Sequence, residues 1–471
     1  MYPPSSTDNP QTPEHSAAWL RTLPAIRERC NAVFSLAQQD KLQYFEYHPE
    51  NEEKVAQFCK EIVHKQYGKE YDKIPPHGRW RHCDAHHPRV EPLRSLWSDS
   101  PSPPDDEEVA ARLIDLFTVS VLLDAGAGPT WSYIEPALAP ICTPERAGGK
   151  FARSEGLAVA AVHMFAAGLF SGGAEHKVTA DGLSQLTPAA LAAGLQVTAE
   201  NPLVGLEGRA ALLTRLADAL RANPEFFPGG RPGGLVAYMK KKRRLKLGTN
   251  EIDVPMEALW NALITGLQPI WPPRESLGGV ELGDVWTCPA LGAAAGELSL
   301  KGHPSSHGLV PFHKLTGWLA YSLREPLERI LNWKIRDGDL QTGLPEYRNG
   351  GLFLDLGCLA LRPTPLSLPN APAEPLPRNP QSGLPRVEPG HPAIVEWRAM
   401  TVVLLDRTLL ALRTALPAPN LTLAQALESA TWAGGRAIAA QLRPAKLDAD
   451  GKVLEGGGGP PIELVSDGTV F

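Results

Sequence analysis

Apolar residues recur every three to four positions along most of this chain, and this period constrains the fold more than any other feature. Such spacing places apolar side chains on one face of an α-helix. Strand-like alternation is scarce and is limited to residues 353–361 and 461–471. We therefore expect a mainly α fold with a few short strands. The expected helices span residues 19–38, 51–64, 105–123, 155–170, 208–221, 256–267, 313–333, 393–416 and 423–442.

The chain has 471 residues, which is enough for more than one domain. We find no internal repeat and no polar linker between two cores, so we expect a single large helical domain at residues 16–471. Residues 1–15 are expected to form a flexible tail. Proline and glycine cluster in loops, above all in residues 363–392. This long insertion is expected to be mobile, and whether it closes over a pocket as a lid stays open.

The formal net charge of −6 provides no general basic surface, which argues against a nucleic-acid-binding protein. The basic run at residues 240–244 is short and is expected at an exposed helix end or loop. The six cysteines include no CxxC pair, and we recognise neither a secretory leader nor the ~18 apolar residues that span a membrane. We expect a cytoplasmic protein with free thiols and no membrane or nucleic-acid partner.

The segment GLPEYRNGGLFLD at residues 343–355 crowds polar side chains around a glycine pair inside an apolar region. Burying a carboxylate and a guanidinium is unfavourable unless they pair with each other or with a ligand. A small-molecule pocket in a glycine-kinked loop is one interpretation, and a Glu346/Arg348 ion pair that pins the loop is the other. The candidate ligand-binding residues of this segment are Glu346, Tyr347, Arg348, Asn349 and Asp355.

Asp124 ends the helix expected at residues 105–123 and precedes a glycine-rich turn with Trp131 beyond it. The turn allows a ligand to approach the backbone closely, although it lacks the spacing of a phosphate-binding loop. Trp318, Tyr321 and Glu325 share one face of the helix at 313–333, as a pocket wall or as core. Glu396 opens the helix at 393–416, where a buried acid with a raised pKa could act as a general acid or merely start the helix.

Residues 79–87, RWRHCDAHH, bring potential metal ligands close together in sequence, but we see no distant CxxC or HxxxH partner. Phosphate binding by Arg79, Arg81 and His82 is an alternative for this segment. We find no motif for covalent acyl or peptide chemistry. The remaining acids, aromatic rings and arginines suit the cleavage of a glycosidic bond, in which an acid protonates the leaving group and a carboxylate stabilises charge.

Six motifs together resemble the uracil catabolism protein four family: LLDAGAGPTWSY, RSEGLAVAAVHMF, VPFHKLTGWLAYSLREPLE, TGLPEYRNGGLFLD, VEWRAMTVVLLDR and PPIELVSDGTVF. This resemblance implies a role in the non-reductive breakdown of uracil that releases urea. The turn FPGGRPG and the motifs WLAYSLREP and EWRA are also similar to queuosine salvage nucleosidases, which implies a DNA-glycosylase-like helical fold. Ala320 stands where that pattern carries an aspartate, whereas Glu396 is retained.

These observations predict an N-ribosyl hydrolase that cleaves ribosylurea or its 5′-phosphate, without cofactor or metal. Its partners are expected to be the ribosyl substrate and other uracil-catabolism enzymes. A non-catalytic binding or scaffold protein of the same pathway and a metal-dependent amidohydrolase using residues 82–87 are the alternatives. The candidate acids are Glu396, Asp124 and Glu346, with Glu396 weighted first. The candidate substrate-binding residues are Trp131, Arg231, His313, Trp318, Tyr321, Tyr347, Arg348, Asn349, Asp355 and Arg398.

Overall fold

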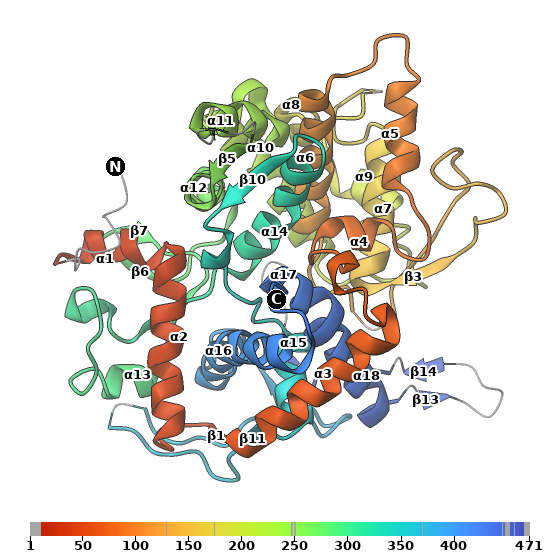
Figure 1. Cartoon of the computed structure of the whole chain (residues 1–471). Coiled ribbons are helices and arrows are strands. Elements are labelled where there is room, and N and C mark those ends of the chain that lie inside the picture. Colours follow the sequence, from red (N-terminus) through yellow and green to blue (C-terminus); the bar gives the residue numbers. More distant parts are fainter. Residues whose placement is uncertain are drawn as a thin grey trace. The chain divides into compact units, whose positions relative to one another are not determined.

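The structure is a computed structural model that describes residues 11–128, 130–173, 175–245, 248, 251–369, 371–444, 446–447, 453–455 and 457–465. Over these residues the chain is mainly helical, with short strands in small sheets (Figure 1). The prediction of a mainly α fold is thus confirmed. The chain divides into two compact units, and its organisation as a single domain stays a prediction. Unit 1 comprises Met1–His77, Pro273–Gly317 and Asp339–Ser466, and unit 2 comprises Gly78–Pro272, Trp318–Gly338 and Asp467–Phe471.

In unit 1 the long helix α16 (Pro392–Ala415) is buried along most of its length and lies against α2 (Leu23–Gln38), α3 (Glu52–Tyr67) and α15 (Tyr347–Asp355). Its strand pairs are β1 (Phe45–Tyr47) with β11 (Leu359–Leu361), β6 (Ser276–Leu277) with β7 (Val280–Glu281), β8 (Val285–Thr287) with β9 (Leu309–Pro311), β12 (Arg386–Val387) with β15 (Glu463–Leu464), and β13 (Lys446–Leu447) with β14 (Val453–Glu455). The other helices are α1 (Pro13–Leu20), α2 (Leu23–Gln38), α3 (Glu52–Tyr67), α13 (Pro289–Ala293), α15 (Tyr347–Asp355), α17 (Leu423–Ala426), the π-helix η8 (Leu427–Trp432) and α18 (Ala433–Leu442).

In unit 2 the central helix is α6 (Asp106–Leu122), which packs against α4 (Arg79–Cys83) and α7 (Arg153–Ala166). The antiparallel pair is β2 (Ser132–Ile134) with β3 (Lys150–Ala152), and the three-stranded sheet is β10 (Trp333–Arg336), β5 (Ile252–Pro255) and β4 (Arg244–Leu245). The other helices are α4 (Arg79–Cys83), α5 (Val90–Ser98), α7 (Arg153–Ala166), α8 (Ala180–Ser184), α9 (Pro188–Gly194), α10 (Leu206–Ala222), α11 (Leu235–Lys242) and α12 (Met256–Gly266), and α14 (Lys314–Arg329) enters unit 2 at Trp318.

Helix α6 begins and ends where the sequence predicts. The Asp105 side chain caps it by accepting from the Glu108 amide at 2.8 Å, and acidic residues fill the first turn, where the helix dipole favours them. The helix stops at Leu122, and Asp124 follows directly in the glycine-rich turn. This placement fixes Asp124 at the end of a buried, well-capped helix.

Three local predictions need correction. The helix expected at 19–38 is broken between α1 and α2, because Pro24 lies in the first turn of α2 and cannot continue an earlier helix. The helix expected at 313–333 ends at Arg329, a few residues after Pro326. The strand expected at 353–361 is reduced to β11, since its first residues belong to α15.

The expected glycine-kinked loop at 343–355 is mostly the helix α15. Its glycines allow close helix contact: a Cβ at Gly350 would lie 2.7 Å from Nε1 of Trp397 on α16. The glycine pair therefore serves the approach of α15 to α16. At the other predicted strand, 461–471, the structure gives β15, and residues 466–471 lie outside the described part.

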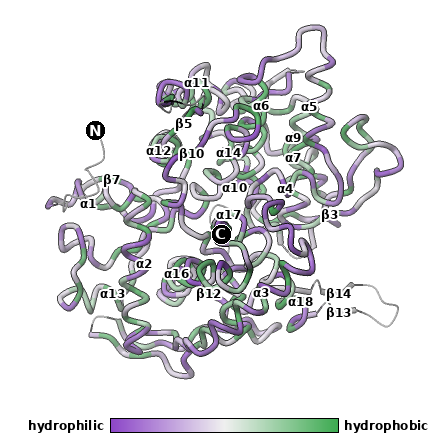
Figure 2. The backbone as a smooth tube through the Cα atoms, in the orientation of Figure 1, coloured by the Kyte–Doolittle hydropathy of each residue, from purple (hydrophilic) through white to green (hydrophobic). Residues whose placement is uncertain are grey.

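Hydrophilic and hydrophobic residues alternate along the helices of each unit, as expected for amphipathic helices (Figure 2). None of the described helices is long and apolar enough to cross a membrane. In the segment expected as a mobile insertion, β12 pairs with β15, and the Gln43 side chain donates to the Ala371 carbonyl at 3.0 Å. These contacts attach the segment to unit 1. Its role as a lid stays a prediction.

Candidate functional site

A buried group of polar side chains in unit 2 gathers at the end of α6, and we call Arg79, Ser120, Asp124 and Ser154 the Arg79 cluster. Arg79 Nη1 donates to Asp124 Oδ2 at 2.6 Å, and the Ser154 hydroxyl donates to the same oxygen at 2.6 Å. Arg79 Nε donates to Ser120 Oγ at 2.8 Å. The Arg79 side chain is fully buried, whereas 15% of the Asp124 side chain is exposed. Asp124 is thus a fixed carboxylate that still reaches solvent.

A second arginine holds the loop that carries Asp124. Arg209, on α10, is fully buried and donates to the carbonyl oxygens on both sides of Asp124, those of Leu123 and Ala125, each at 2.9 Å. A guanidinium offers five donors in a rigid plane, so one side chain can hold several carbonyls of an irregular turn. The position of the carboxylate is therefore set by the side-chain contacts of Arg79 and by the backbone contacts of Arg209.

Helix α14 borders the Arg79 cluster through Ser322, whose hydroxyl accepts from the Arg79 amide at 3.1 Å. On the same helix Glu325 is 2% exposed, and its Oε1 accepts from Arg81 and from Arg329, the latter at 3.0 Å. Trp318 and Tyr321 are also buried on this helix. The predicted shared face is therefore a buried one, next to the Arg79 cluster.

Glu396, weighted first among the candidate acids, is fully buried in unit 1. Its Oε1 accepts from the Gln43 amide at 2.8 Å and its Oε2 from the Tyr44 amide at 2.9 Å. Burial raises the pKa of Glu396 to about 7. Its two oxygens hold the chain that leads into β1, so the carboxyl group serves the fold of unit 1 directly.

The raised pKa of Glu396 makes a prediction for stability against pH. A carboxyl group with a folded pKa near 7 and a usual, unfolded-chain pKa of 4.5 contributes stability that is complete below pH 4.5 and is lost as the pH rises through 7. Glu396→Gln does not titrate. We expect the free energy of unfolding of the wild type, relative to Glu396→Gln, to fall by on the order of 3 kcal/mol across this window. Denaturant titrations from pH 4 to pH 8 measure it, and a pH-independent difference would contradict it.

Glu346 is the N-cap of α15 and accepts from the amides of Arg348 at 2.7 Å and Asn349 at 2.6 Å. Burial raises the pKa of Glu346. The Arg348 guanidinium instead donates to the Gly458 carbonyl and lies over the Tyr347 ring, 4.9 Å from its centroid. Among these described residues, Glu346 and Arg348 therefore do not form the side-chain ion pair considered from the sequence, because the Glu346 carboxylate caps a helix.

The other polar groups of α15 also bind within unit 1. The Asn349 amide donates to the Leu344 carbonyl at 3.0 Å, and Asp355 forms a bidentate pair with Arg443 at 2.8 and 2.5 Å. The ligand contacts expected of Tyr347, Arg348, Asn349 and Asp355 stay predictions. Their observed contacts hold the helices of unit 1 together.

Arg398 pairs with an acid that the sequence did not single out. Its Nη1 and Nη2 each donate to an oxygen of Asp284 at 2.8 Å, and the guanidinium lies 4.1 Å from the Phe312 ring centroid. Burial opposes ionisation of Asp284, but the Arg398 guanidinium and further donors hold its pKa well below the usual range. His313 contacts the Leu20 carbonyl at 3.0 Å, and burial lowers the pKa of His313 to about 4.

Two candidates in unit 2 have structural partners. Arg231 donates to Asp115 Oδ2 at 2.5 Å and to Glu108 Oε2 at 2.9 Å, so a phosphate there would compete with two carboxylates. The Trp131 side chain is almost fully buried, and its Nε1 donates to the Leu195 carbonyl at 3.0 Å. We do not assign a substrate contact to either residue.

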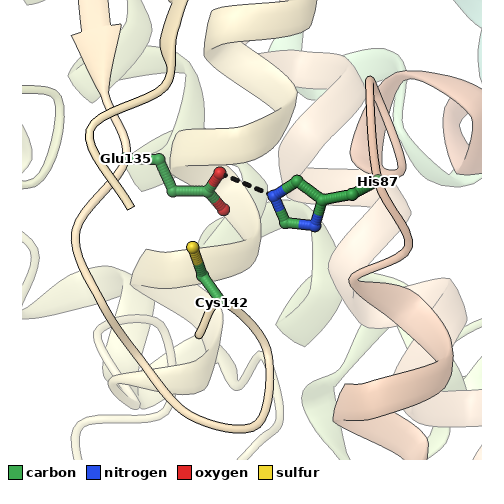
Figure 3. Close-up of side chains that lie close together, drawn as sticks. All are labelled: His87, Glu135 and Cys142. Atoms are coloured by element: carbon green, nitrogen blue, oxygen red, sulfur yellow. Dashed lines mark hydrogen bonds and ion pairs between the residues drawn. The ribbon is translucent and has the colours of Figure 1, made fainter. Parts of the chain in front are cut away.

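The segment 79–87 does not assemble a metal site from its own residues. The His82 ring lies 5.3 Å from the Trp318 ring, the His86 ring lies 5.0 Å from Phe151, and His87 contacts Glu135. His87, Glu135 and Cys142 do come together, with one ligand atom from each within 4.8 Å of the others (Figure 3). This group is the candidate metal site among the described residues.

Its chemistry does not fit a metal, because Glu135 is already saturated. Oε1 accepts from Arg89 Nε at 2.5 Å and His163 Nε2 at 2.9 Å, and Oε2 accepts from Arg89 Nη2 at 2.6 Å and His87 Nε2 at 2.9 Å. A cation would have to displace donors and sit beside a buried guanidinium. Burial also raises the pKa of the Cys142 thiol, while a metal needs the thiolate. We name Glu135, Arg89, His87 and His163 the Glu135 cluster.

Comparison with known proteins identifies the family of this mainly helical chain. A family model described as "Protein of unknown function (DUF1688)" matches residues 19–471, and the chain belongs to that family. It is 40% identical over 468 residues to "Uracil catabolism protein 4" of Lachancea kluyveri, covering 98% of this chain and 100% of the relative. It is 38% identical over 463 residues to "Protein urg3" of Schizosaccharomyces pombe (strain 972), covering 97% and 99%. The family resemblance inferred from the six motifs is confirmed.

Proposed function

We propose that this protein acts in uracil catabolism as an N-ribosyl hydrolase that converts ribosylurea, or its 5′-phosphate, to urea and the free sugar. Its similarity to uracil catabolism protein 4 supports the pathway. The observation that carries the reaction is Asp124, a partly exposed carboxylate held by Arg79 and Ser154 at 2.6 Å each. Such a group can orient water and stabilise positive charge at a sugar carbon.

The reaction needs one water molecule. The C1–N bond breaks with its electron pair moving to the ureido nitrogen, and positive charge develops on the ribosyl ring. Asp124 stabilises that charge and accepts a proton from water as the water oxygen bonds to C1. The proton then passes to the ureido nitrogen, which leaves as urea. Arg79 and Ser154 hold the carboxylate in one orientation throughout, and this lowers the reorganisation needed in the transition state.

We reorder the candidate acids in this proposal according to their contacts. Both oxygens of Glu396 hold backbone amides, and Glu346 caps α15 with its carboxylate. Asp124 has side-chain partners and remains partly exposed. We therefore place Asp124 first, ahead of Glu396, because both oxygens of Glu396 already accept from backbone amides and Asp124 is partly exposed.

Synthetic ribosylurea and its 5′-phosphate test the proposal directly. Purified protein is incubated with each compound, with and without a chelator, and urea is measured over time. We expect urea release that the chelator does not abolish. Binding of the substrate without urea release would instead favour the non-catalytic binding or scaffold protein.

A further inference from the structure

Two buried polar atoms near the beginning of α4 have no hydrogen-bond partner among the described residues: Arg79 Nη2 and Glu325 Oε2. The side chain of Arg79 is fully buried and that of Glu325 is 2% exposed. Leaving a buried ionic donor or acceptor unpaired is unfavourable, and such atoms are rare in folded proteins. Each atom is therefore available to a bound group that supplies the missing partner.

Other polar atoms of the same two side chains do have partners. Arg79 uses Nε and Nη1 on Ser120, Asp124 and Ser154, and Glu325 uses Oε1 on two arginines. The atoms belong to adjoining segments: the Arg79 amide donates to Ser322 on α14, and a Cβ at Gly78 would lie 3.2 Å from Glu325 Oε2. The absence of a side chain at Gly78 thus allows the segment before α4 to approach α14 closely.

The two atoms need opposite hydrogen-bonding groups: Arg79 Nη2 needs an acceptor, and Glu325 Oε2 needs a donor. A fully ionised phosphate offers only acceptors, and the Glu325 carboxylate would repel it. A ureido group carries a carbonyl oxygen and N–H groups in one plane. We propose that Arg79 Nη2 and Glu325 Oε2 recognise the ureido group of the substrate, a specificity that rests on the proposed function.

The same contact assists departure of urea. When the C1–N bond breaks, negative charge spreads from the ureido nitrogen onto its carbonyl oxygen. Arg79 Nη2 donates to that oxygen while Nη1 of the same guanidinium holds Asp124, so the leaving group lies beside the carboxylate that orients water. The side chains that pair with Arg79 and Glu325 are partly exposed, Asp124 by 15% and Arg81 by 19%.

Glu325→Gln tests the recognition with little change in shape. Arg81 and Arg329 keep an oxygen facing them, so the amide NH₂ takes the position of Oε2 and replaces an acceptor by a donor. We expect the affinity for ribosylurea to fall by about 10- to 100-fold and the affinity for ribose to stay unchanged. The matched control is Glu328→Gln on the same helix, where Glu328 pairs with Arg324 at 3.0 Å and is 32% exposed.

Calorimetric titrations with ribosylurea, ribose and inorganic phosphate measure these affinities, in an Asp124→Asn background so that substrate is not consumed. Equal ribosylurea affinity in the two glutamine variants, or an equal loss for ribose, would overturn the inference. Arg79→Lys, which keeps the charge but removes Nη2, is a second variant should Glu325→Gln fold poorly, and it is expected to lose ribosylurea affinity.

The two proposals fail separately. Glu325-dependent binding of ribosylurea to a wild-type protein that releases no urea would end the hydrolase proposal and leave the recognition standing. Urea release by the wild type, with binding unaffected by Glu325→Gln and Arg79→Lys, would end the recognition and leave the hydrolase standing.

Discussion

Replacing Asp124 by Asn is expected to lower kcat for urea release from ribosylurea by about 10²- to 10⁴-fold. The amide keeps the size of the side chain and an oxygen that accepts from Arg79 and Ser154. It carries no negative charge to stabilise the ribosyl cation and accepts no proton from water. The variant also leaves the buried Arg79 without its counter-charge, so we expect a lower free energy of unfolding, and the rates are compared at a temperature at which both proteins are folded.

The control for this variant is Asp181→Asn. Asp181 lies in the same unit, its side chain is 86% exposed, and it pairs with Arg221 at 2.7 Å. This exposed pair contributes little to stability, and kcat is expected to match the wild type. Steady-state kinetics on both variants separates the outcomes. A fully active Asp124→Asn protein would remove Asp124 from the mechanism.

Glu135→Gln is expected to have the largest effect on stability. Glu135 and Arg89 are both fully buried, and the carboxylate accepts from Nε and Nη2 of the guanidinium at 2.5 and 2.6 Å. Removing the negative charge leaves Arg89 buried without a counter-charge, which lowers the free energy of unfolding by about 3–5 kcal/mol. Denaturant unfolding of wild type and variant at pH 7 measures this difference.

The pH dependence of Glu135 has a defined direction. Burial opposes ionisation of Glu135, but hydrogen bonds from Arg89, His163 and His87 hold its pKa well below the usual glutamate value of 4.5. A lowered pKa contributes stability that is present above the unfolded value and is lost as the pH falls through the folded one. The difference between wild type and Glu135→Gln is therefore expected to shrink below pH 4.5. Glu91→Gln, which changes an exposed pair with Arg94, is the control.

A constant difference between wild type and Glu135→Gln from pH 7 down to pH 3 would contradict the lowered pKa. A loss of less than about 1 kcal/mol at pH 7 would contradict the view that Arg89 depends on Glu135 for its charge balance. Either result would contradict the structural role that we assign to the Glu135 cluster.

Helices with a long apolar stripe were predictable from the sequence alone. The expected helix at 256–267 corresponds to α12, Met256–Gly266, and the expected helix at 208–221 to α10, Leu206–Ala222. For the segment around Gly350 the sequence predicts a loop where the structure has a helix, because glycine permits both a turn and a close helix contact. Only the position of Trp397 on α16 decides between them, and that position is not local in sequence.

Of the candidate site, Asp124 was predictable from the sequence, but its contacts were not. Asp124 stands out locally, at the end of an apolar helix before a glycine-rich turn. Its partner Arg79 lies 45 positions away, and the partner of Glu135, Arg89, lies 46 positions away. Residue type and spacing do not give such pairs, since the fold brings them together. The sequence therefore marked Arg79 only as a phosphate candidate and did not single out Glu135.

The most direct test of the account is hydrolysis of ribosylurea in ¹⁸O-labelled water, with the products analysed by mass spectrometry before sugar exchange is complete. Attack of water at C1, as proposed for Asp124, places the label on ribose and leaves urea unlabelled. Label in carbamate or carbon dioxide, with unlabelled sugar, would mean attack at the ureido carbon and would contradict an N-ribosyl hydrolase.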